Sequence, residues 1–207
     1  MTGMIVTKTL KLRALLTAPL SSMCMHTVTE IKGNKNVYDV VIVGGGMVGT
    51  TMACKLGHDR RLSNKRILLL EGSPKKEWQL TPHYSNRVSA LNGGTKSLLE
   101  SIGAWEKIYK TRCKAVKKMQ VWDALSDAMI TFNNDGMAEE IAYIVENDLL
   151  VDSVSKCLEE RTSNVEVIYE AKVKNCKLPS SDVLSGAHDL AQIEMEDGTS
   201  YSCRLLF

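Results

Sequence analysis

Residues 38–49 read YDVVIVGGGMVG, an apolar and β-branched run that ends in a cluster of glycines. Its first part, 38–43, is typical of a strand buried on both faces in a parallel sheet. Residues 47–58 (MVGTTMACKLGH) have helical periodicity, and a second apolar strand, RILLLE, follows at 66–71. The stretch therefore predicts a strand, helix, strand unit of the parallel crossover type.

The turn between the first strand and the helix carries a G-x-G-x-x-G pattern, with glycines at Gly44, Gly45, Gly46 and Gly49. In dinucleotide-binding domains the first glycine permits a tight turn, the second admits a pyrophosphate, and the third lets the helix pack closely. Glu71 ends the second strand, 22 residues after Gly49, where a carboxylate can accept hydrogen bonds from ribose hydroxyls. We therefore predict that these five residues bind a dinucleotide, the alternative being a structural glycine turn.

Three other kinds of motif are absent: a P-loop, a serine-hydrolase elbow and a metal-binding cluster. A P-loop needs Lys-Ser or Lys-Thr after its glycines, whereas Gly49 is followed by Thr50 and Thr51. The G-x-S-x-G elbow of serine hydrolases does not occur. The six cysteines form no Cys-x-x-Cys pair, and the histidines lie at no metal-ligand spacing from them. We therefore predict no metal site, and we expect free thiols that mostly fill core positions.

The composition is that of a globular protein, and 207 residues suffice for one well-buried domain. The formal charge of +2, from 26 basic and 24 acidic residues, is too balanced for a nucleic-acid-binding surface. No segment approaches the roughly 18 apolar residues that indicate a membrane-spanning helix. We therefore expect no nucleic-acid partner and no membrane span.

Residues 1–36 have the composition of an organellar import signal. No Asp or Glu occurs before Glu30, whereas Lys8, Lys11 and Arg13 are interleaved with leucines. On a helix this pattern gives a basic amphipathic segment. We expect residues 1–36 to be a transit peptide, with a disordered leader as the alternative, and residues 37–207 to form the folded domain.

The rest of the chain is rich in predicted strands. Residues 72–84 contain two prolines and predict an exposed loop, and residues 94–102 predict a helix. Asn147 stands where the N-cap of a further helix would be. Short strands are expected at 118–122, 128–132, 141–145, 165–169 and 172–178, followed by a hairpin around Asp197 and Gly198.

Residues 85–91 (SNRVSAL) resemble the arginine-containing segment of the flavin-dependent aromatic-ring hydroxylases. In that family the arginine contacts FAD, and a guanidinium suits this role because it forms charge-assisted bonds to a pyrophosphate. The resemblance implies that Arg87 binds FAD together with the glycines and Glu71; a surface arginine is the alternative. The expected fold is an α/β, Rossmann-like FAD/NAD(P)-binding domain of the aromatic-hydroxylase type, with a strand-rich second half.

Further segments narrow the resemblance. GAWEKI at 103–108, KMQVWDA at 118–124 and YIVEND at 143–148 are similar to segments of the eukaryotic ubiquinone-biosynthesis monooxygenases. That resemblance implies an FAD-dependent monooxygenase, an oxidoreductase that hydroxylates ring carbon 5 of a polyprenylated 4-hydroxybenzoate-type precursor. It also implies a ferredoxin-type electron donor, other ubiquinone-biosynthesis proteins as partners, and a peripheral position on the matrix side of the mitochondrial inner membrane. Because the flavin carries out the oxygen chemistry, no catalytic residue is expected in this chain.

The same resemblance implies that the chain is the amino-terminal half of such an enzyme. The FAD-binding domain, residues 37–207, would then be incomplete at its carboxyl end, and residues beyond Phe207 would bind the flavin ring. Two rival interpretations stay open. One is a non-catalytic, truncated flavoprotein or complex subunit. The other is an NAD(P)-dependent Rossmann reductase, which would share the glycines and Glu71 but has no need of Arg87.

Overall fold

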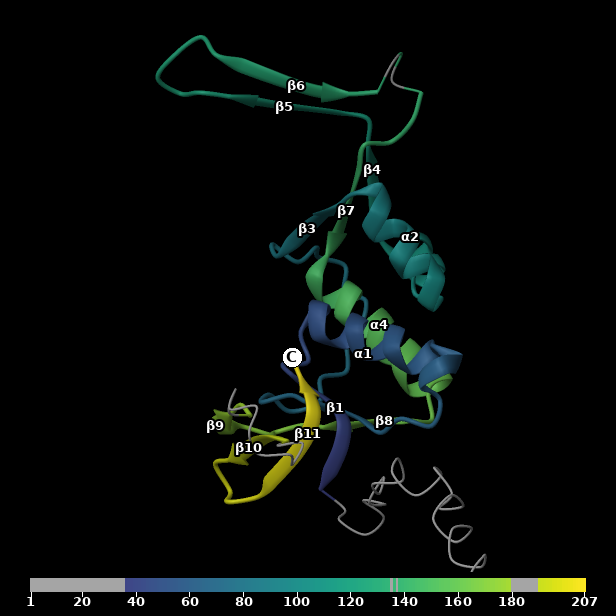
Figure 1. Ribbon diagram of the computed structural model, residues 1–207. Helices are drawn as coiled ribbons and strands as arrows, with labels where there is room; N and C mark the ends of the chain where they lie inside the picture. The colour runs from purple at the N-terminus through teal and green to yellow at the C-terminus, as the bar shows by residue number, and fades with distance from the viewer. Residues whose placement is uncertain (1–35, 135, 137, 180–189) are drawn as a thin grey trace, which may run out of the picture. The chain divides into compact units, whose positions relative to one another are not determined.

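A computed structural model of the protein describes residues 36–134, 136, 138–179 and 190–207 (Figure 1). All of them belong to one compact unit that runs from Asn36 to Phe207. The transit peptide predicted at 1–36 lies outside the described residues, apart from Asn36. The helices of the described part are α1 (Met47–His58), the short 3-10 helix η1 (Arg60–Leu62), α2 (Gly93–Ile102), α3 (Trp105–Thr111) and α4 (Asn147–Arg161).

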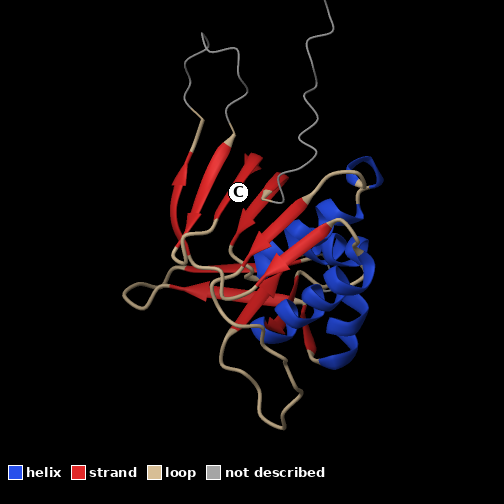
Figure 2. Ribbon diagram, turned by 90° about the horizontal axis from the view of Figure 1, so that it is seen from below, coloured by secondary structure: helices blue, strands red, loops and turns tan. Residues whose placement is uncertain are grey.

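The largest sheet within the described residues has six strands. Their spatial order is β8 (Val165–Ile168), β2 (Ile67–Leu70), β1 (Val37–Val43), β11 (Ser200–Leu206), β10 (Ala191–Met195) and β9 (Val173–Lys177). β1 is parallel to β2 and β11, and β2 is parallel to β8, whereas β10 is antiparallel to β11 and β9. α1 connects β1 to β2 and lies against both, so the predicted crossover unit is confirmed. The helices gather on one side of the strands (Figure 2).

β1 is buried on both faces of this sheet, as its apolar run predicts. Val40 and Ile42 belong to the larger apolar cluster, which includes residues of α1 and α4. Val41 points to the opposite face and belongs to a second cluster with Ile193 and Cys203. Because the alternation of the strand sends apolar side chains to both clusters, the position of the glycine turn that follows β1 is well defined.

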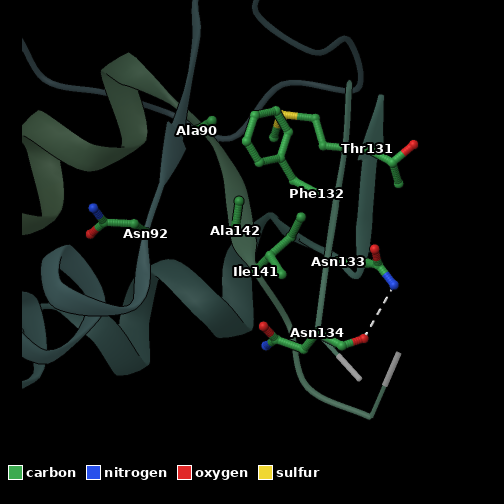
Figure 3. A pocket seen from close by; sticks show the side chains of 9 residues that line it. Ala90, Asn92, Thr131, Phe132, Asn133, Asn134, Ile141 and Ala142 are labelled. Carbon is green, nitrogen blue, oxygen red and sulfur yellow. Dashed lines mark hydrogen bonds between the residues drawn. The ribbon is translucent and has the colours of Figure 1, made fainter. Parts of the chain in front are cut away.

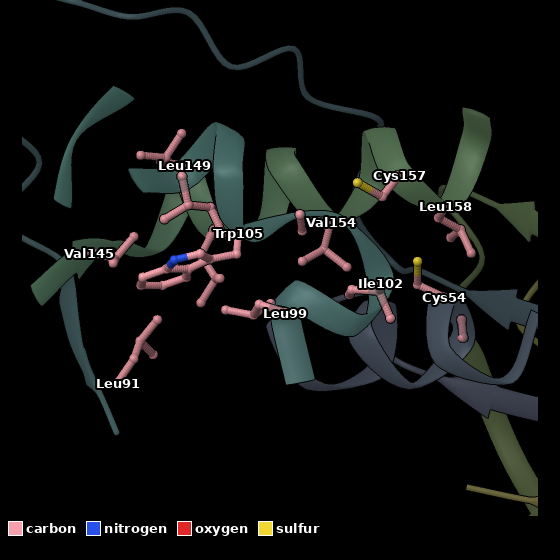
Figure 4. Close-up of a cluster of buried hydrophobic side chains, with 14 of the residues drawn as sticks. Cys54, Leu91, Leu99, Ile102, Trp105, Val145, Leu149, Val154, Cys157 and Leu158 are labelled. Atoms are coloured by element: carbon pink, nitrogen blue, oxygen red, sulfur yellow. The ribbon is translucent and has the colours of Figure 1, made fainter. Parts of the chain in front are cut away.

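The helices α1 and α4 pack against each other in the same direction. A Cβ atom placed on Gly57, near the end of α1, would lie 2.7 Å from Cγ2 of Thr162, just after the end of α4. Cys54, three residues earlier in α1, has Cys157 of α4 as its neighbour in the cluster drawn in Figure 4. Since earlier residues of α1 meet earlier residues of α4, the two amino ends lie at the same end of the helix pair.

Two smaller sheets are antiparallel. One has the order β3 (Val88–Leu91), β7 (Ala142–Glu146) and β4 (Cys113–Val116). The other is a ribbon of β5 (Lys118–Trp122) and β6 (Met129–Asn133). The structure confirms the strands predicted between residues 118 and 145, the helix predicted at 94–102, and the final hairpin.

Some elements differ from the sequence analysis. It did not predict β3, α3 or β4, which are only four to seven residues long and carry weak patterns. The N-cap prediction for Asn147 is wrong, because Asn147 is the first residue of α4 and Glu146 precedes it as the cap. The Asn147 side chain instead accepts a hydrogen bond of 2.6 Å from the hydroxyl of Ser89.

Most of the described cysteines fill core positions, as expected. Cys54, Cys157 and Cys203 are buried, and burial raises the pKa of the Cys54 thiol to about 12. Cys113 is half-buried, whereas Cys176 is exposed on the edge strand β9 and does not fill the core. All of these cysteines are free thiols.

Candidate dinucleotide site

The glycine turn has a backbone conformation and a closeness of packing that larger residues would not allow. Gly44 has φ of +105°, a region that favours glycine, and its amide donates a hydrogen bond of 2.8 Å to the carbonyl of Leu70. A Cβ atom on Gly49 would overlap the carbonyl oxygen of Gly44. The hydroxyl of Thr50, which is buried, donates to the Gly45 carbonyl at 2.8 Å. The turn is therefore fixed by contacts within itself and with β2.

One side of the turn is open and lined by hydrogen-bond donors. A Cβ atom on Gly46 would meet nothing within 4 Å. Among the described residues, no hydrogen bond is donated by the amides of Gly46, Met47 or Val48, which lie at the start of α1. Free amides and the positive end of the helix dipole attract an anion. The open side of the turn therefore presents backbone amide donors at the positive end of α1.

Glu71 lies directly beside this turn. One of its carboxylate oxygens accepts a hydrogen bond of 2.6 Å from the amide of Gly45, and the other accepts one of 2.8 Å from the amide of Ser73. Partial burial acts to raise the pKa of the Glu71 carboxyl, but the hydrogen bonds from Ser73 and Gly45 outweigh burial and lower it. The structure thus brings an ionised carboxylate next to the glycine turn.

Arg87 lies at the amino end of α4. Its carbonyl accepts a hydrogen bond of 2.9 Å from the amide of Asn147, while its side chain is exposed and forms no ion pair with any described residue. The amino ends of α1 and α4 lie at the same end of the helix pair, so Arg87 and the glycine turn lie toward one end of it. Among the described residues, no hydrogen bond or ion pair joins Arg87 to Glu71 or to the turn.

The sequence analysis missed a buried ion pair next to Arg87. Nη1 of Arg112 lies 3.3 Å from Oε1 of Glu146, and the two side chains are only 15% and 5% exposed. Arg112 directly follows α3 and Glu146 ends β7, so they are distant in sequence and no local motif links them. The one available signal was that Glu146 lies within YIVEND, a segment noted for its resemblance and not for its charge.

A separate hollow lies between the β5–β6 ribbon and the strands β3 and β7 (Figure 3). It has a volume of roughly 570 Å³ and is lined by apolar side chains, including Met119 and Phe132, and by asparagine amides such as Asn92. None of its lining residues belongs to the glycine turn, and neither Glu71 nor Arg87 lines it. The predicted site and this hollow are therefore distinct features of the described part.

The described part has the fold of the FAD-dependent aromatic hydroxylases. A solved structure of PqsL from Pseudomonas aeruginosa, described as a probable FAD-dependent monooxygenase, matches with a TM-score of 0.56 and 18% sequence identity. The match covers 83% of this chain and 42% of that one. No protein-family model matches the sequence.

Curated relatives narrow this class further. The chain is 45% identical to the mitochondrial ubiquinone biosynthesis monooxygenase COQ6 of Rattus norvegicus over 172 residues. This alignment covers 83% of the chain. The human protein of the same name is 42% identical over 171 residues, or 82% of the chain. The chain spans 36% of the length of each of these relatives. Over most of its length, the chain is thus a homologue of the ubiquinone biosynthesis monooxygenases.

Proposed function

We propose that this chain binds FAD and is the FAD-binding part of a ubiquinone-biosynthesis monooxygenase. The observation that carries the proposal is the glycine turn, which has an open, donor-lined side beside an ionised Glu71 in a homologue of these enzymes. The residues present fit the adenosine and pyrophosphate part of FAD. Residues 37–207 are the proposed FAD-binding domain.

The start of α1, Glu71 and Arg87 have separate tasks in this proposal. The amides of Gly46 and Met47, at the positive end of α1, donate to the pyrophosphate. The Glu71 carboxylate accepts from ribose hydroxyls, exchanging its present bond from Gly45 for a ligand hydroxyl. The free guanidinium of Arg87 reaches a phosphate oxygen. Bound FAD would supply the oxygen chemistry, so the role of these residues is to bind and orient it.

The remaining parts of the proposal rest on the relatives. We propose hydroxylation of ring carbon 5 of a polyprenylated 4-hydroxybenzoate-type precursor, with electrons from a ferredoxin-type donor. Other ubiquinone-biosynthesis proteins are the proposed partners. The relatives are named mitochondrial, which supports a mitochondrial location and a transit peptide at 1–36. In the part of the chain that the structure describes, no helix has the length and hydrophobicity of a membrane span. We also propose a peripheral position on the matrix side of the inner membrane.

The test is a titration of the full 207-residue chain with FAD, followed by flavin fluorescence. A Cβ atom on Gly46 meets no protein atom within 4 Å, so we expect the Gly46→Val side chain to occupy the open side and exclude the pyrophosphate while the fold is kept. We expect FAD affinity to fall by more than about tenfold and the melting temperature to stay within about 3 °C of the wild type.

Gly93→Val is the matched control, because Gly93 also lies at the start of a helix and a Cβ atom on it meets nothing within 4 Å. This variant should bind FAD like the wild type. If the wild type binds NADPH and not FAD, the rival reductase interpretation is correct. Equal FAD affinity in the wild type and the Gly46→Val variant would disprove the assignment of the glycine turn.

A further inference from the structure

We propose that Arg112 is a positioning residue for Arg87, and that it acts through the buried ion pair with Glu146. The proposal rests on the proposed function in one respect, since Arg87 must bind the pyrophosphate of FAD for its position to matter. The proposal concerns only residues of this chain and their contacts. It assigns Arg112 no contact with the cofactor.

The contacts of Arg112 fix the loop that precedes Arg87. Its guanidinium donates to the carbonyl of His83 at 3.0 Å and to the carbonyl of Thr81. It also lies over the ring of Tyr84, with the guanidinium carbon 4.3 Å from the ring centroid. One nearly buried cation therefore binds three residues of an otherwise exposed loop, in which no helix or strand occurs between Leu70 and Val88.

Glu146 completes the connection from the other side. Its Oε1 atom accepts a hydrogen bond of 2.5 Å from the amide of Ser85, as well as the contact from Arg112. Glu146 is 4% exposed, so its charge needs a partner, and Arg112 supplies it. Removing Arg112 would leave a buried carboxylate with one neutral donor, which favours local opening of the loop.

Arg87 lies two residues after Ser85. Its backbone is held at the junction of β7 and α4, where Glu146 also lies. Ser85 is bound to Glu146, the Arg87 carbonyl is bound to the Asn147 amide, and the Ser89 hydroxyl is bound to the Asn147 side chain. Residues 85–89 are thus attached to the junction of β7 and α4. This attachment leaves the Arg87 side chain free while its backbone is held.

The two arginines have different tasks because their surroundings differ. Arg112 is largely buried, its charge is balanced by Glu146, and its donors are used by carbonyls of the loop. Arg87 is exposed and has no ion pair among the described residues. A guanidinium already paired with a carboxylate is a poor phosphate ligand, whereas a free one is a good one. The geometry therefore assigns binding to Arg87 and positioning to Arg112.

The first experiment compares Arg112→Met with Lys110→Met by FAD titration of the full chain. Lys110 is the matched control, since it lies two residues away and forms only an exposed pair with Glu106. We expect Arg112→Met to lower FAD affinity about tenfold and Lys110→Met to leave it unchanged. Arg112→Met/Glu146→Gln is made as well, so that the test does not depend on a variant with an unpaired buried carboxylate. This double variant removes the buried charge and keeps an acceptor for the Ser85 amide. Its FAD affinity should also be about tenfold lower than that of the wild type.

A double-mutant cycle separates positioning from general destabilisation. Arg87→Ala alone should weaken FAD binding. Adding Arg112→Met/Glu146→Gln to this variant should lower FAD affinity by less than about a further twofold. Additive losses would overturn the proposal, because they would mean that the pair acts independently of Arg87. Unchanged FAD affinity in both Arg112 variants would overturn it as well.

Limited trypsin digestion gives a readout that does not use FAD. Trypsin cleaves after Arg87 only when this segment opens, whereas exposed Lys76 in the same loop provides an internal reference. We expect the Arg112 variants to raise the ratio of cleavage at Arg87 to cleavage at Lys76 by about tenfold. If the wild type fails to bind FAD but the ratio rises, the proposed function is wrong and the positioning contact stands. An unchanged ratio would refute the positioning contact.

Discussion

The glycine turn and the Arg87 segment, residues 85–91, are stabilised in different ways. The turn is stabilised by its own backbone and by β2, through the Gly44 amide and the Glu71 carboxylate. The Arg87 segment is stabilised by residues about sixty positions later in the chain, at the junction of β7 and α4. The first region forms whenever the crossover unit forms. The second is attached at several points: β3 pairs with β7, Asn147 binds Arg87 and Ser89, and Ser85 binds the Glu146 carboxylate that pairs with Arg112.

The largest effect is expected where the turn is most crowded. In Gly49→Val, the added side chain would overlap the carbonyl of Gly44, so α1 must shift away from β1. We expect a loss of about 3 kcal/mol or more in the free energy of unfolding, together with loss of detectable FAD binding. Urea denaturation followed by tryptophan fluorescence measures the first quantity, and FAD titration measures the second. A variant with wild-type stability would show that the turn is less tightly packed than the structure has it.

This difference between the regions also explains what the sequence could predict. The strand, the glycines, the helix and Glu71 lie within 34 consecutive residues, and each leaves a local pattern of hydrophobicity or residue type. Their arrangement followed from those patterns. Arg112 and Glu146 come from separate elements, and α3, which Arg112 follows, was not predicted. Their pairing leaves no spacing signal, because a buried ion pair depends on how the elements pack.

Arg87→Ala should have the next largest effect, and it should affect binding alone. The side chain is exposed and forms no ion pair among the described residues, so its removal should leave the free energy of unfolding within about 0.5 kcal/mol of the wild type. A charged hydrogen bond is worth about 1.5 to 3 kcal/mol, which corresponds to a loss of roughly 10- to 150-fold in FAD affinity. Titration of the variant beside Arg60→Ala, an exposed arginine of η1, checks this. Equal FAD affinities for the two variants would mean that Arg87 does not contact FAD.

Glu71→Gln should have the smallest effect on FAD affinity, below that of Arg87→Ala. Glutamine keeps one acceptor oxygen that can bind a ribose hydroxyl, so the charge and one of the two acceptor oxygens are lost but the ribose contact is kept. The same titration gives the order of the two variants. If Glu71→Gln proved the more damaging change, the ribose contact would outweigh the phosphate contact, and the comparison between the two regions would be reversed.

Acid conditions sharpen the Glu71 prediction, because the lowered pKa of its carboxyl has a consequence for stability. A carboxyl whose pKa is lower in the folded state contributes stability above its unfolded pKa, and this contribution is lost as the pH falls through the folded value. The contribution is small, since hydrogen bonds from Gly45 and Ser73 are partly offset by burial. Glu71→Gln should therefore melt about 2 °C below the wild type at pH 7, and the gap should close as the pH falls toward 3.

Glu100→Gln is the control for the acid experiment, because Glu100 lies on α2 and has only an exposed, 3.7 Å contact with Lys96. Its melting temperature should follow that of the wild type at every pH, since a contact of this kind contributes little to stability. A gap for Glu71→Gln that stays constant from pH 7 to 3 would mean that the carboxylate charge does not support the turn. The turn would then be stabilised by its backbone contacts alone, and Glu71 would be present for the ligand and not for the fold.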